Sequence, residues 1–356
     1  MMLKIVKSLL ICVVMICIVV IAAFAQNNSN CVSTYTFGPF GNYPGPGWQC
    51  HFIDDHGPFA FLVECTKPNA TCPPLAGPSE TNKKGSCPTC NAASPINLVT
   101  GNTFVEENDV KIPGLSNGLT LTRIWNSQWP PTQSASQIGL FGPNWRSTFE
   151  ERIFFGNDGY YKYSRGDGSF WSFGSSSSGW KVVAPANDLA TLVANSNYTF
   201  WTLTFQNGEQ RIFNYASGYL TTIIDRNGNT TQLSYDSLNR LVTVTDPGGR
   251  HLYFSYPNNT SYLVTTITSD VGISLSYSYD SNGRLAQITK PDQTILSISY
   301  DSNSMIAAVT DSSGKVLESH TYDSCGRGLT SSRAGGVEAV TVSYAQPCWQ
   351  PPIGEQ

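Results

Sequence analysis

The chain has 356 residues, which is enough for two or three domains, and a net charge of −4 at neutral pH. Charged residues make up 13% of the sequence, about half of the usual share, whereas Gly, Pro and aromatic residues are plentiful. Because Lys and Arg do not cluster, the sequence argues against nucleic acid or an anionic membrane surface as a partner.

Residues 1–25 are predicted to form a signal peptide. Lys4 and Lys7 precede an apolar run from Leu9 to Phe24, and small residues on both sides of Phe24 suit cleavage before Gln26. The alternative is an uncleaved membrane anchor, but the run is shorter than the roughly 20 residues of a spanning helix. The sequence therefore predicts a secreted or cell-surface protein without membrane contact after cleavage.

Residues 26–90 are predicted to be a Cys-rich, loop-rich segment with little helix, because Pro and Gly interrupt it repeatedly. Of the 10 cysteines of the chain, Cys12 and Cys17 lie in the predicted signal peptide, so eight would remain. In an oxidising compartment, such a segment is commonly stabilised by disulfides, whose connectivity the sequence leaves open. The disulfide candidates of the chain are Cys31, Cys50, Cys65, Cys72, Cys87, Cys90, Cys325 and Cys348.

Two patterns in this segment also suit a metal or redox site. One combines thiol, imidazole and carboxylate groups and comprises Cys50, His51, Asp54, Asp55 and His56. The other is the Cys-x-x-Cys spacing of Cys87 and Cys90, which zinc and redox sites use. Since no second Cys-x-x-Cys pair and no βαβ pattern accompany it, structural disulfides are favoured and no metal or cofactor is predicted.

Residues 91–205 are predicted to form a β domain. Leu119 and Leu121 alternate with threonines, which is the period of a half-buried strand, and residues 149–155, 160–163, 169–173 and 198–205 show related patterns. Gly- and Asp-rich turns at 156–159 and 166–168 suit hairpins. Residues 180–194 are the one stretch that could hold a short helix.

Residues 206–345 contain a Tyr about every 21 residues, which marks stacked supersecondary units. The recurring residues are Tyr215, Tyr235, Tyr256, Tyr279, Tyr300, Tyr322 and Tyr344. Each unit reads as a hairpin: an alternating strand ends at the Tyr, a tight turn follows, and a second strand places apolar residues six and nine positions after the Tyr. The units in series predict one long antiparallel sheet, followed by a tail at 346–356.

Three copies of the repeat are nearly identical, and their shared residues are predicted to be structural. Tyr supplies an apolar ring with a hydroxyl, Asp with Asn or Gly sets the turn, and Arg can bridge to the Asp of its own or the adjacent repeat. The repeat-defining residues are Tyr235, Asp236, Arg240, Tyr279, Asp280, Gly283, Arg284, Tyr300, Asp301, Tyr322, Asp323, Gly326 and Arg327. Cys325 and Cys348 lie about one repeat apart, which makes them a candidate disulfide pair.

The motif Tyr-Asp-x-x-Gly/Asn-Arg-Leu resembles that of the Rhs/YD-repeat family of bacterial and teneurin proteins. Upstream, residues 94–102 (Ser-Pro-Ile-Asn-Leu-Val-Thr-Gly-Asn), 121–127 and 140–146 resemble the N-terminal domain of this family in the same order. The resemblance covers about residues 94–345 and implies an all-β fold in which a sheet of hairpin repeats spirals into a hollow shell.

In larger relatives, the shell encloses a C-terminal toxin or effector or presents an adhesive surface. Relatives with cargo have a self-cleaving Asp in an Asp-Pro-x-Gly-Leu setting. The nearest string here, residues 246–249, lacks the Leu and reads as a repeat turn. Neither self-cleavage nor cargo is expected, because only 12 residues follow Tyr344.

The remaining candidates for chemistry are few. His320 shares a strand face with Glu318 and Tyr322, but a general acid–base role would need a nucleophile nearby. Tryptophans cluster in residues 125–201, where core packing competes with glycan binding. Trp125 and Trp171 are the candidate glycan contacts.

The first functional prediction is a secreted, non-enzymatic protein with a structural or interaction role. One alternative is a carbohydrate-binding or adhesive module that uses the Trp-rich domain. Another is a truncated remnant of a longer toxin-bearing protein. Extracellular glycans or another protein are the expected partners, and open sheet edges would permit self-association.

Overall fold

The structure, a computed structural model, describes residues 96–98, 100–128, 139–156, 160–176, 179–185, 189–333 and 336–344. These residues are almost entirely β-structure. Among them, the one helical element is the short 3-10 turn η1 (Leu115–Asn117). The predicted all-β class is thereby confirmed. Residues 1–18 of the predicted signal peptide and the tail at 346–356 lie outside the described residues, whereas residues 19–25 lie in a strand.

By contacts, the chain divides into one unit of Met1–Pro78 with Phe155–Tyr160 and another of Ser79–Phe154 with Tyr161–Gln356. In the first unit, strands β1 (Val19–Asn27), β2 (Asn30–Phe37), β3 (Gln49–Asp55) and β4 (Phe61–Pro68) pair in the antiparallel order β1-β2-β4-β3. The segment expected to be loop-rich thus carries paired strands. Its side chains lie outside the described residues, as do the metal-like pattern at residues 50–56 and every disulfide candidate except Cys325. For all of these, the sequence remains the sole basis of the prediction.

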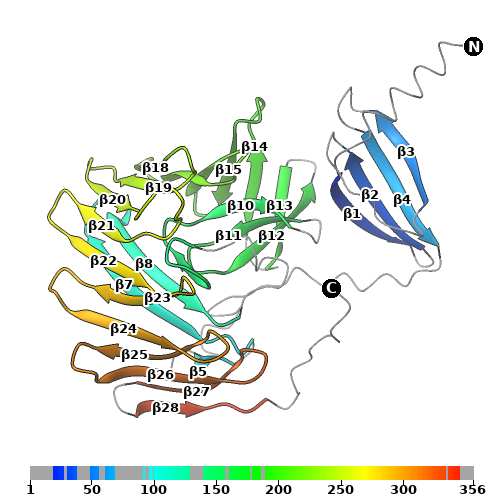
Figure 1. Ribbon diagram of the computed structural model, residues 1–356. Helices are drawn as coiled ribbons and strands as arrows, with labels where there is room; N and C mark the ends of the chain where they lie inside the picture. Colours follow the sequence, from blue (N-terminus) through cyan, green and yellow to red (C-terminus); the bar gives the residue numbers. More distant parts are fainter. Residues whose placement is uncertain are drawn as a thin grey trace, which may run out of the picture. The chain divides into compact units, whose positions relative to one another are not determined.

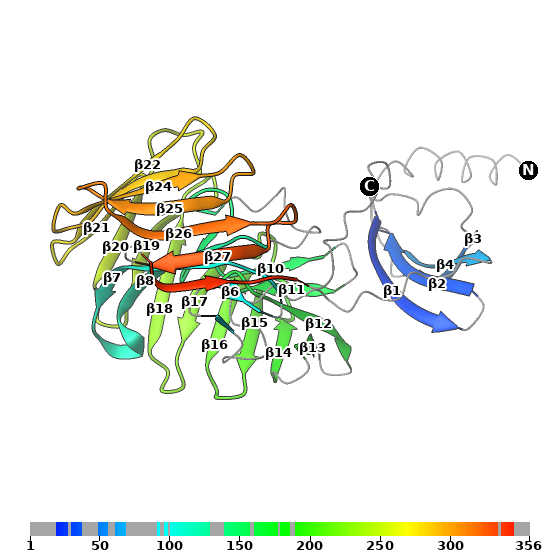
Figure 2. The same cartoon turned by 90° about the horizontal axis from the view of Figure 1, so that it is seen from below.

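One antiparallel sheet of 19 strands dominates the second unit, and each strand pairs with the next along the chain (Figures 1 and 2). The strands are β10 (Arg152–Phe155), β11 (Tyr161–Ser164), β12 (Phe170–Ser176), β13 (Gly179–Ala184), β14 (Ala190–Ala194), β15 (Phe200–Phe205), β16 (Gln210–Asn214), β17 (Leu220–Ile224), β18 (Thr230–Tyr235), β19 (Leu241–Thr245), β20 (His251–Ser255), β21 (Thr266–Ser269), β22 (Ser274–Tyr279), β23 (Leu285–Thr289), β24 (Ile295–Tyr300), β25 (Ile306–Asp311), β26 (Val316–Tyr322), β27 (Gly328–Arg333) and β28 (Val337–Thr341). This is the predicted series of hairpins. The short helix considered for residues 180–194 is wrong, because β13 and β14 occupy that stretch.

A smaller sheet lies against the inner face of the large one. It consists of β7 (Phe104–Ile112), β8 (Leu119–Asn126) and β9 (Trp145–Ser147), and the short pair β5 (Asn91–Ala92) and β6 (Ile96–Asn97) precedes it. Figures 1 and 2 show β7 and β8 running inside the curl of the large sheet. Throughout this article, the inner hairpin means residues 104–126.

The core lies between the inner hairpin and the large sheet. Along the repeats, the apolar residues at six and nine positions after the Tyr are buried, as predicted: Leu241 and Val244, Leu285 and Ile288, and Ile306 and Val309. On the other side, the core includes Val105, Leu121, Trp125, Phe141 and Trp145. Because strand side chains alternate between faces, every second residue of each repeat strand contributes to this core.

Candidate functional site

The tyrosine hydroxyls of the repeats form a regular ladder of hydrogen bonds. Six of the seven hydroxyls donate to a backbone carbonyl 15 or 16 residues earlier, at 2.7–2.9 Å. The pairs are Tyr235 with Leu220, Tyr256 with Leu241, Tyr279 with Val264, Tyr300 with Leu285, Tyr322 with Ile306 and Tyr344 with Gly328. Burial raises the pKa of Tyr300 to about 12. A phenol held neutral in this way remains a donor across the physiological range.

The aspartate of each repeat organises the turn that follows. Asp280 Oδ1 accepts hydrogen bonds from the backbone N–H groups of Asn282 and Arg284, both at 2.9 Å, and its Oδ2 accepts one from Arg284 Nε at 2.7 Å. Asp236 and Asp323 repeat this arrangement with their own arginines. Burial alone would raise the pKa of Asp280, but these hydrogen bonds outweigh burial and hold the pKa below its usual value. The predicted Arg bridge therefore goes to the Asp of the same repeat.

In the three repeats that carry it, the arginine also stacks on the tyrosine of the next repeat. The guanidinium carbon lies 4.5 Å from the ring centre for Arg240 over Tyr256 and for Arg284 over Tyr300, and 4.2 Å for Arg327 over Tyr344. Each arginine thus links two successive units by an ion pair and a cation–π contact. Such nearest-neighbour links are how repeat arrays gain their stability.

The motif has Gly or Asn at one turn position because the backbone there adopts a positive φ. Gly283 and Gly326 have φ values of 72° and 74°, and Asn239, in the equivalent turn, has a φ of 60°. Only Gly adopts this left-handed region without cost, and Asn tolerates it better than most residues. In the Tyr300 repeat, Met305 stands where the others have Arg. The ring of Tyr322, in the following repeat, is instead contacted edge-on by Trp125 of the inner hairpin at 6.2 Å.

We expect Tyr256→Phe to destabilise the chain by about 1 kcal/mol, because it deletes one rung of the hydroxyl ladder and leaves the Leu241 carbonyl without this donor. Urea unfolding followed by tryptophan fluorescence would measure the change. The matched control is Tyr253→Phe, since the side chain of Tyr253 is 41% exposed. Equal losses for the two variants would contradict the structural role of the ladder.

The turn aspartates predict a loss of stability in acid. Hydrogen bonds from an arginine four residues later lower the pKa of Asp236, Asp246, Asp280 and Asp323 against the opposing effect of burial. A carboxyl group whose pKa is lower in the folded state stabilises the fold above its unfolded pKa of about 4, and this stabilisation is lost as the pH falls through the folded value. Burial raises the pKa of Glu150, so this group has the opposite effect on the pH dependence of stability. It is a single group, whereas four aspartates favour the fold at neutral pH.

The measurement is the urea midpoint at a series of pH values from 7 down to the acid limit. We expect the midpoint to fall steeply below about pH 4, and to fall less steeply in Asp280→Asn, which no longer titrates at that position. A midpoint that stays level down to the acid limit would contradict the role of these aspartates.

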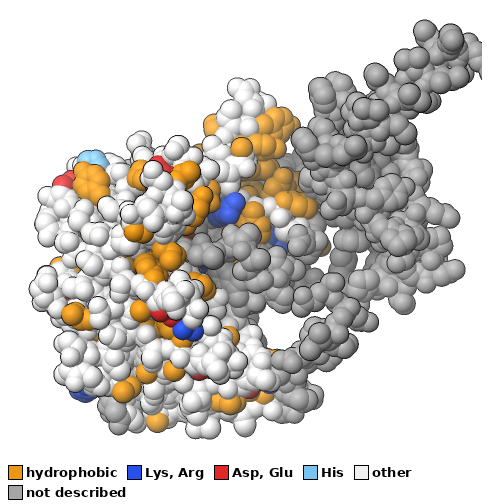
Figure 3. Space-filling model, in the orientation of Figure 1, with side chains coloured by type: hydrophobic (Ala, Val, Ile, Leu, Met, Phe, Trp, Pro, Cys, Tyr) orange, Lys and Arg blue, Asp and Glu red, His pale blue; other side chains and the backbone are white. Residues whose placement is uncertain are grey.

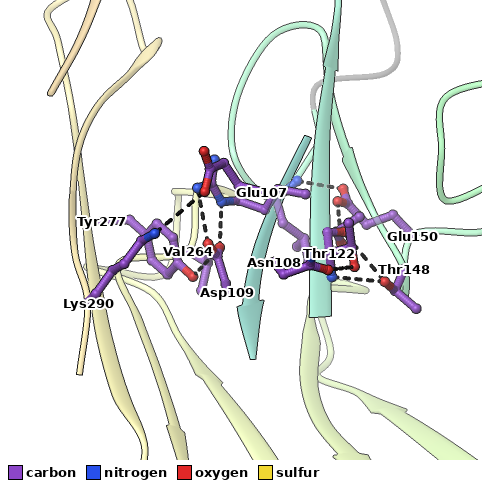
Figure 4. A network of polar contacts seen from close by, with 12 residues as sticks. Glu107, Asn108, Asp109, Thr122, Thr148, Glu150, Val264, Tyr277 and Lys290 are labelled. Atoms are coloured by element: carbon purple, nitrogen blue, oxygen red, sulfur yellow. Dashed lines mark hydrogen bonds and ion pairs between the residues drawn. The ribbon is translucent and has the colours of Figure 1, made fainter. Parts of the chain in front are cut away.

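The inner hairpin is joined to the large sheet by a buried group of three side chains. Asp109 of β7 forms a bidentate ion pair with Arg123 of β8, with 3.1 Å between Arg123 Nη2 and Asp109 Oδ1. Tyr277 of β22 donates its hydroxyl to Asp109 Oδ2 at 2.7 Å (Figure 4). Neither side chain of the ion pair is exposed. The charge and hydrogen bonds of Asp109 outweigh the effect of burial and raise the pKa of Arg123 above its usual value, so the guanidinium stays charged.

Aromatic rings enclose this ion pair. The guanidinium carbon of Arg123 lies 4.7 Å from the centre of the Trp145 ring and 5.7 Å from that of Phe141. Nearer the surface, Glu107 forms a second ion pair with Lys290 at 3.5 Å, also drawn in Figure 4. The charges of the inner hairpin therefore match groups on the repeat strands, which sets the register of the hairpin within the sheet.

Glu150 organises the loop around β9. Its Oε1 accepts a hydrogen bond from the Leu140 N–H at 2.6 Å, and its Oε2 accepts one from the Ser147 hydroxyl at 2.7 Å. The carbonyl of Leu140 accepts a hydrogen bond from the Val264 N–H at 2.9 Å, which connects the loop to the repeats. Burial lowers the pKa of the neighbouring Arg146 to about 10, although the charge of Glu150 opposes this shift.

The residues on both sides of the inner hairpin contact the last repeats. The Gly328 N–H donates to the Gly101 carbonyl at 2.9 Å, and Gln128 Nε2 donates to the Cys325 carbonyl at 2.8 Å. Cys325 is in a disulfide bond whose partner lies outside the described residues. The pairing with Cys348 therefore stays a prediction.

The two candidate glycan contacts lie in the core. Trp125 is 1% exposed and Trp171 is 7% exposed. The ring of Trp171 is covered by the guanidinium of Arg165 at 5.2 Å and by the rings of Tyr163 and Phe205. These contacts correct the assignment of both tryptophans, because an aromatic ring binds a sugar through an exposed face, and these rings have none.

The structure places a hydroxyl near His320, because Ser331 lies directly opposite it on β27. The Nε2 atom of His320 is 3.3 Å from Glu318 Oε1, without hydrogen-bonding geometry. His320, Glu318 and Ser331 are all buried residues. The interpretation of His320 as a packed histidine is retained, because a substrate could not reach it.

Sequence reasoning missed the group of Asp109, Arg123 and Tyr277. The only signal was the position of Asp109 and Arg123 directly beside apolar strand residues, Val110 and Ile124. A charge that becomes buried in a strand needs a partner. Nothing in the sequence identified the two charges as partners of each other. Within the described part of the chain, no group of three or more His, Cys, Asp or Glu residues is placed to hold a metal ion. The described residues also include no helix with the length and hydrophobicity to cross a membrane.

Two family models match the chain: a domain of unknown function (DUF6531) over residues 93–173, and the Teneurin YD-shell over residues 157–336. No curated protein matches.

Among solved structures, the chain is similar to one in the Tc holotoxin pore of Photorhabdus luminescens, with 14% identity, a TM-score of 0.28, and coverage of 51% of this chain and 11% of that one. It is also similar to the TcdB2–TccC3–Cdc42 complex, with 16% identity, a TM-score of 0.28, and coverage of 62% and 14%. The chain thus spans only a small part of the proteins that these structures contain.

Proposed function

This chain belongs to the Teneurin YD-shell family, and we propose that it acts as a secreted, non-enzymatic shell-type protein with a structural or interaction role. The observation that carries the proposal is the inner hairpin. The concave face of the repeat sheet, which surrounds a hollow in family shells, is occupied here by residues 104–126 and sealed by the buried contacts of Asp109. Because the chain itself fills the concave face of the sheet, the protein contacts other molecules through its outer surface.

The outer surface supports contact with other molecules through uncharged groups. On the face shown in Figure 3, charged side chains are sparse, and apolar ones gather in patches among uncharged polar surface. Exposed apolar residues of the described chain include Leu189, Val193 and Tyr198. Surfaces of this kind favour contact with proteins or glycans over nucleic acid.

The last strand of the large sheet offers a second mode of contact. β28 pairs on one side only within this sheet, whereas β10, at the other end, is also bridged to the turn before β17, where the Ile153 N–H donates to the Gly218 carbonyl at 2.9 Å. An unpaired strand edge can add a further strand, from another protein or from a second copy. Self-association through the edge of β28 therefore forms part of the proposal.

The test is to purify the secreted chain under oxidising conditions and to measure its mass in solution by light scattering, together with the protection of its backbone amides from hydrogen exchange. A discrete species with protected repeat strands would support a self-contained module. An aggregated chain with unprotected repeats would contradict the proposal and favour the alternative of a remnant of a longer toxin-bearing protein.

A further inference from the structure

A pocket of about 100 Å³ lies where the loop before β9 meets the first repeats. Its lining includes three arginines and one carboxylate: Arg146, Arg152, Arg240 and Glu150. Three tyrosines, Tyr219, Tyr235 and Tyr262, also line it. Arginine and tyrosine side by side are the groups that proteins use to hold an acidic ring compound.

The lining of the pocket carries more guanidinium than carboxylate groups. Arg240 is fully engaged: it pairs with Asp236 at 2.7 Å and donates to the carbonyls of Asn258 and Ser261. Beside Arg146 and Arg152, Glu150 is the one carboxylate in the lining. Both carboxylate oxygens of Glu150 already accept hydrogen bonds, from Leu140 and Ser147. An anion entering the pocket would therefore meet an excess of guanidinium groups.

Arg152 is the arginine of the pocket that has N–H groups left to bind a ligand. Its Nε donates to the Ser217 carbonyl at 3.3 Å, and its guanidinium carbon lies 4.7 Å from the centre of the Tyr219 ring. Within the described part of the chain, these are its contacts, and none of them is with a carboxylate. Its outer N–H groups are thus available for a ligand, in the fork geometry that suits a carboxylate.

The nearness of Arg152 to Arg146 carries an electrostatic cost. Burial is the main cause that lowers the pKa of Arg146, and the charge of Glu150 opposes it. The positive charge of Arg152 lowers this pKa further. A bound anion would relieve this repulsion.

The rim of the pocket is open and aromatic. Tyr262 is 52% exposed, and Asn239, also exposed, adds an amide at the turn of the first repeat copy. The pocket itself has room for a small acidic group, whereas a larger body attached to that group would lie against Tyr262. Exposed tyrosine and amide side chains are suited to the apolar face and the hydroxyls of a sugar.

We propose that this pocket binds the carboxylate of an acidic sugar, with Arg152 as the principal contact and Tyr262 against the sugar ring. The inference deepens the proposed interaction role and rests on it. It also moves the glycan site from Trp125 and Trp171, which are buried, to a pocket at the start of the repeats.

The experiment is titration calorimetry of the secreted chain with glucuronate, with glucose as the neutral analogue and with inorganic phosphate. We expect glucuronate to bind and glucose not to bind. We expect Arg152→Gln to weaken glucuronate at least about tenfold, because it removes charged hydrogen bonds to the ligand. Arg226→Gln is the matched control, since Arg226 is exposed and lies outside the pocket.

A second variant separates the sugar from its acid group. Tyr262→Ala should weaken glucuronate while leaving the urea midpoint unchanged, because Tyr262 is half-exposed. No binding of glucuronate, or binding that Arg152→Gln leaves intact, would overturn the inference. Binding of phosphate without glucuronate would overturn the assignment to a sugar acid. A discrete, protected chain that fails to bind glucuronate would contradict this inference and leave the proposed shell-type role standing.

Discussion

Asp109→Asn is expected to destabilise the folded chain by about 3–5 kcal/mol, which is the typical cost of removing one partner from a buried ion pair. Arg123 would remain charged and fully buried, with no carboxylate to neutralise it. Tyr277 would also lose the charged acceptor of its hydroxyl. Urea unfolding of the purified chain, followed by fluorescence, measures the change.

Two controls define this result. The double variant Asp109→Leu with Arg123→Met replaces the pair by apolar groups of similar size, and we expect it to recover most of the loss. Lys290→Gln breaks the ion pair with Glu107, in which both side chains are more than a quarter exposed, and should cost less than about 1 kcal/mol. A loss for Asp109→Asn no larger than that of Lys290→Gln would show that the ion pair does not hold the inner hairpin in place.

Trp125→Ala is expected to cost about 3–5 kcal/mol, because it empties the space of a fully buried indole. Trp125 lies near the end of β8, is 1% exposed, and packs edge-on against Tyr322 of β26. The loss should appear as a lower urea midpoint and as weaker protection of the amides of β26.

The same variant tests where a glycan could bind. If the pocket lined by Arg152 is the sugar site, Trp125→Ala should leave the affinity for glucuronate unchanged under conditions in which the variant is folded. The exposed Tyr262 provides the contrast, since Tyr262→Ala should change binding and leave stability unchanged. Loss of glucuronate affinity in a stable Trp125→Ala variant would contradict the burial of this indole.

The repeat strands could be read from the sequence because each hairpin is local. An alternating strand, a turn with Asp and Gly or Asn, and apolar residues at fixed distances from the Tyr all fall within about 21 residues. The bridge between Asp280 and Arg284 was predictable for the same reason, since four residues separate them. The stacking of Arg284 on Tyr300 was not predicted. It depends on how adjacent hairpins twist, and register shifts at Tyr279 and Tyr300 alter that twist locally.

The candidate sites could not be read in this way. Asp109 and Tyr277 are 168 residues apart, and no local pattern relates them. The pocket also combines Arg146 of β9 and Arg152 of β10 with Tyr262, which lies more than 100 residues later in the loop between β20 and β21. The tryptophans were ambiguous in the sequence, where core packing competed with glycan binding, and the fold places Trp125 and Trp171 inside.

The sequence by itself thus determined the all-β class, the series of hairpins and the chemistry of each turn, because these depend on contacts between near neighbours along the chain. Only the tertiary structure decided what fills the concave face of the sheet, which charges are buried together and which aromatic rings remain exposed. These outcomes depend on how the inner hairpin packs across strands far from it in sequence. Such packing is set by the combined shape and charge of both surfaces, which no single segment specifies.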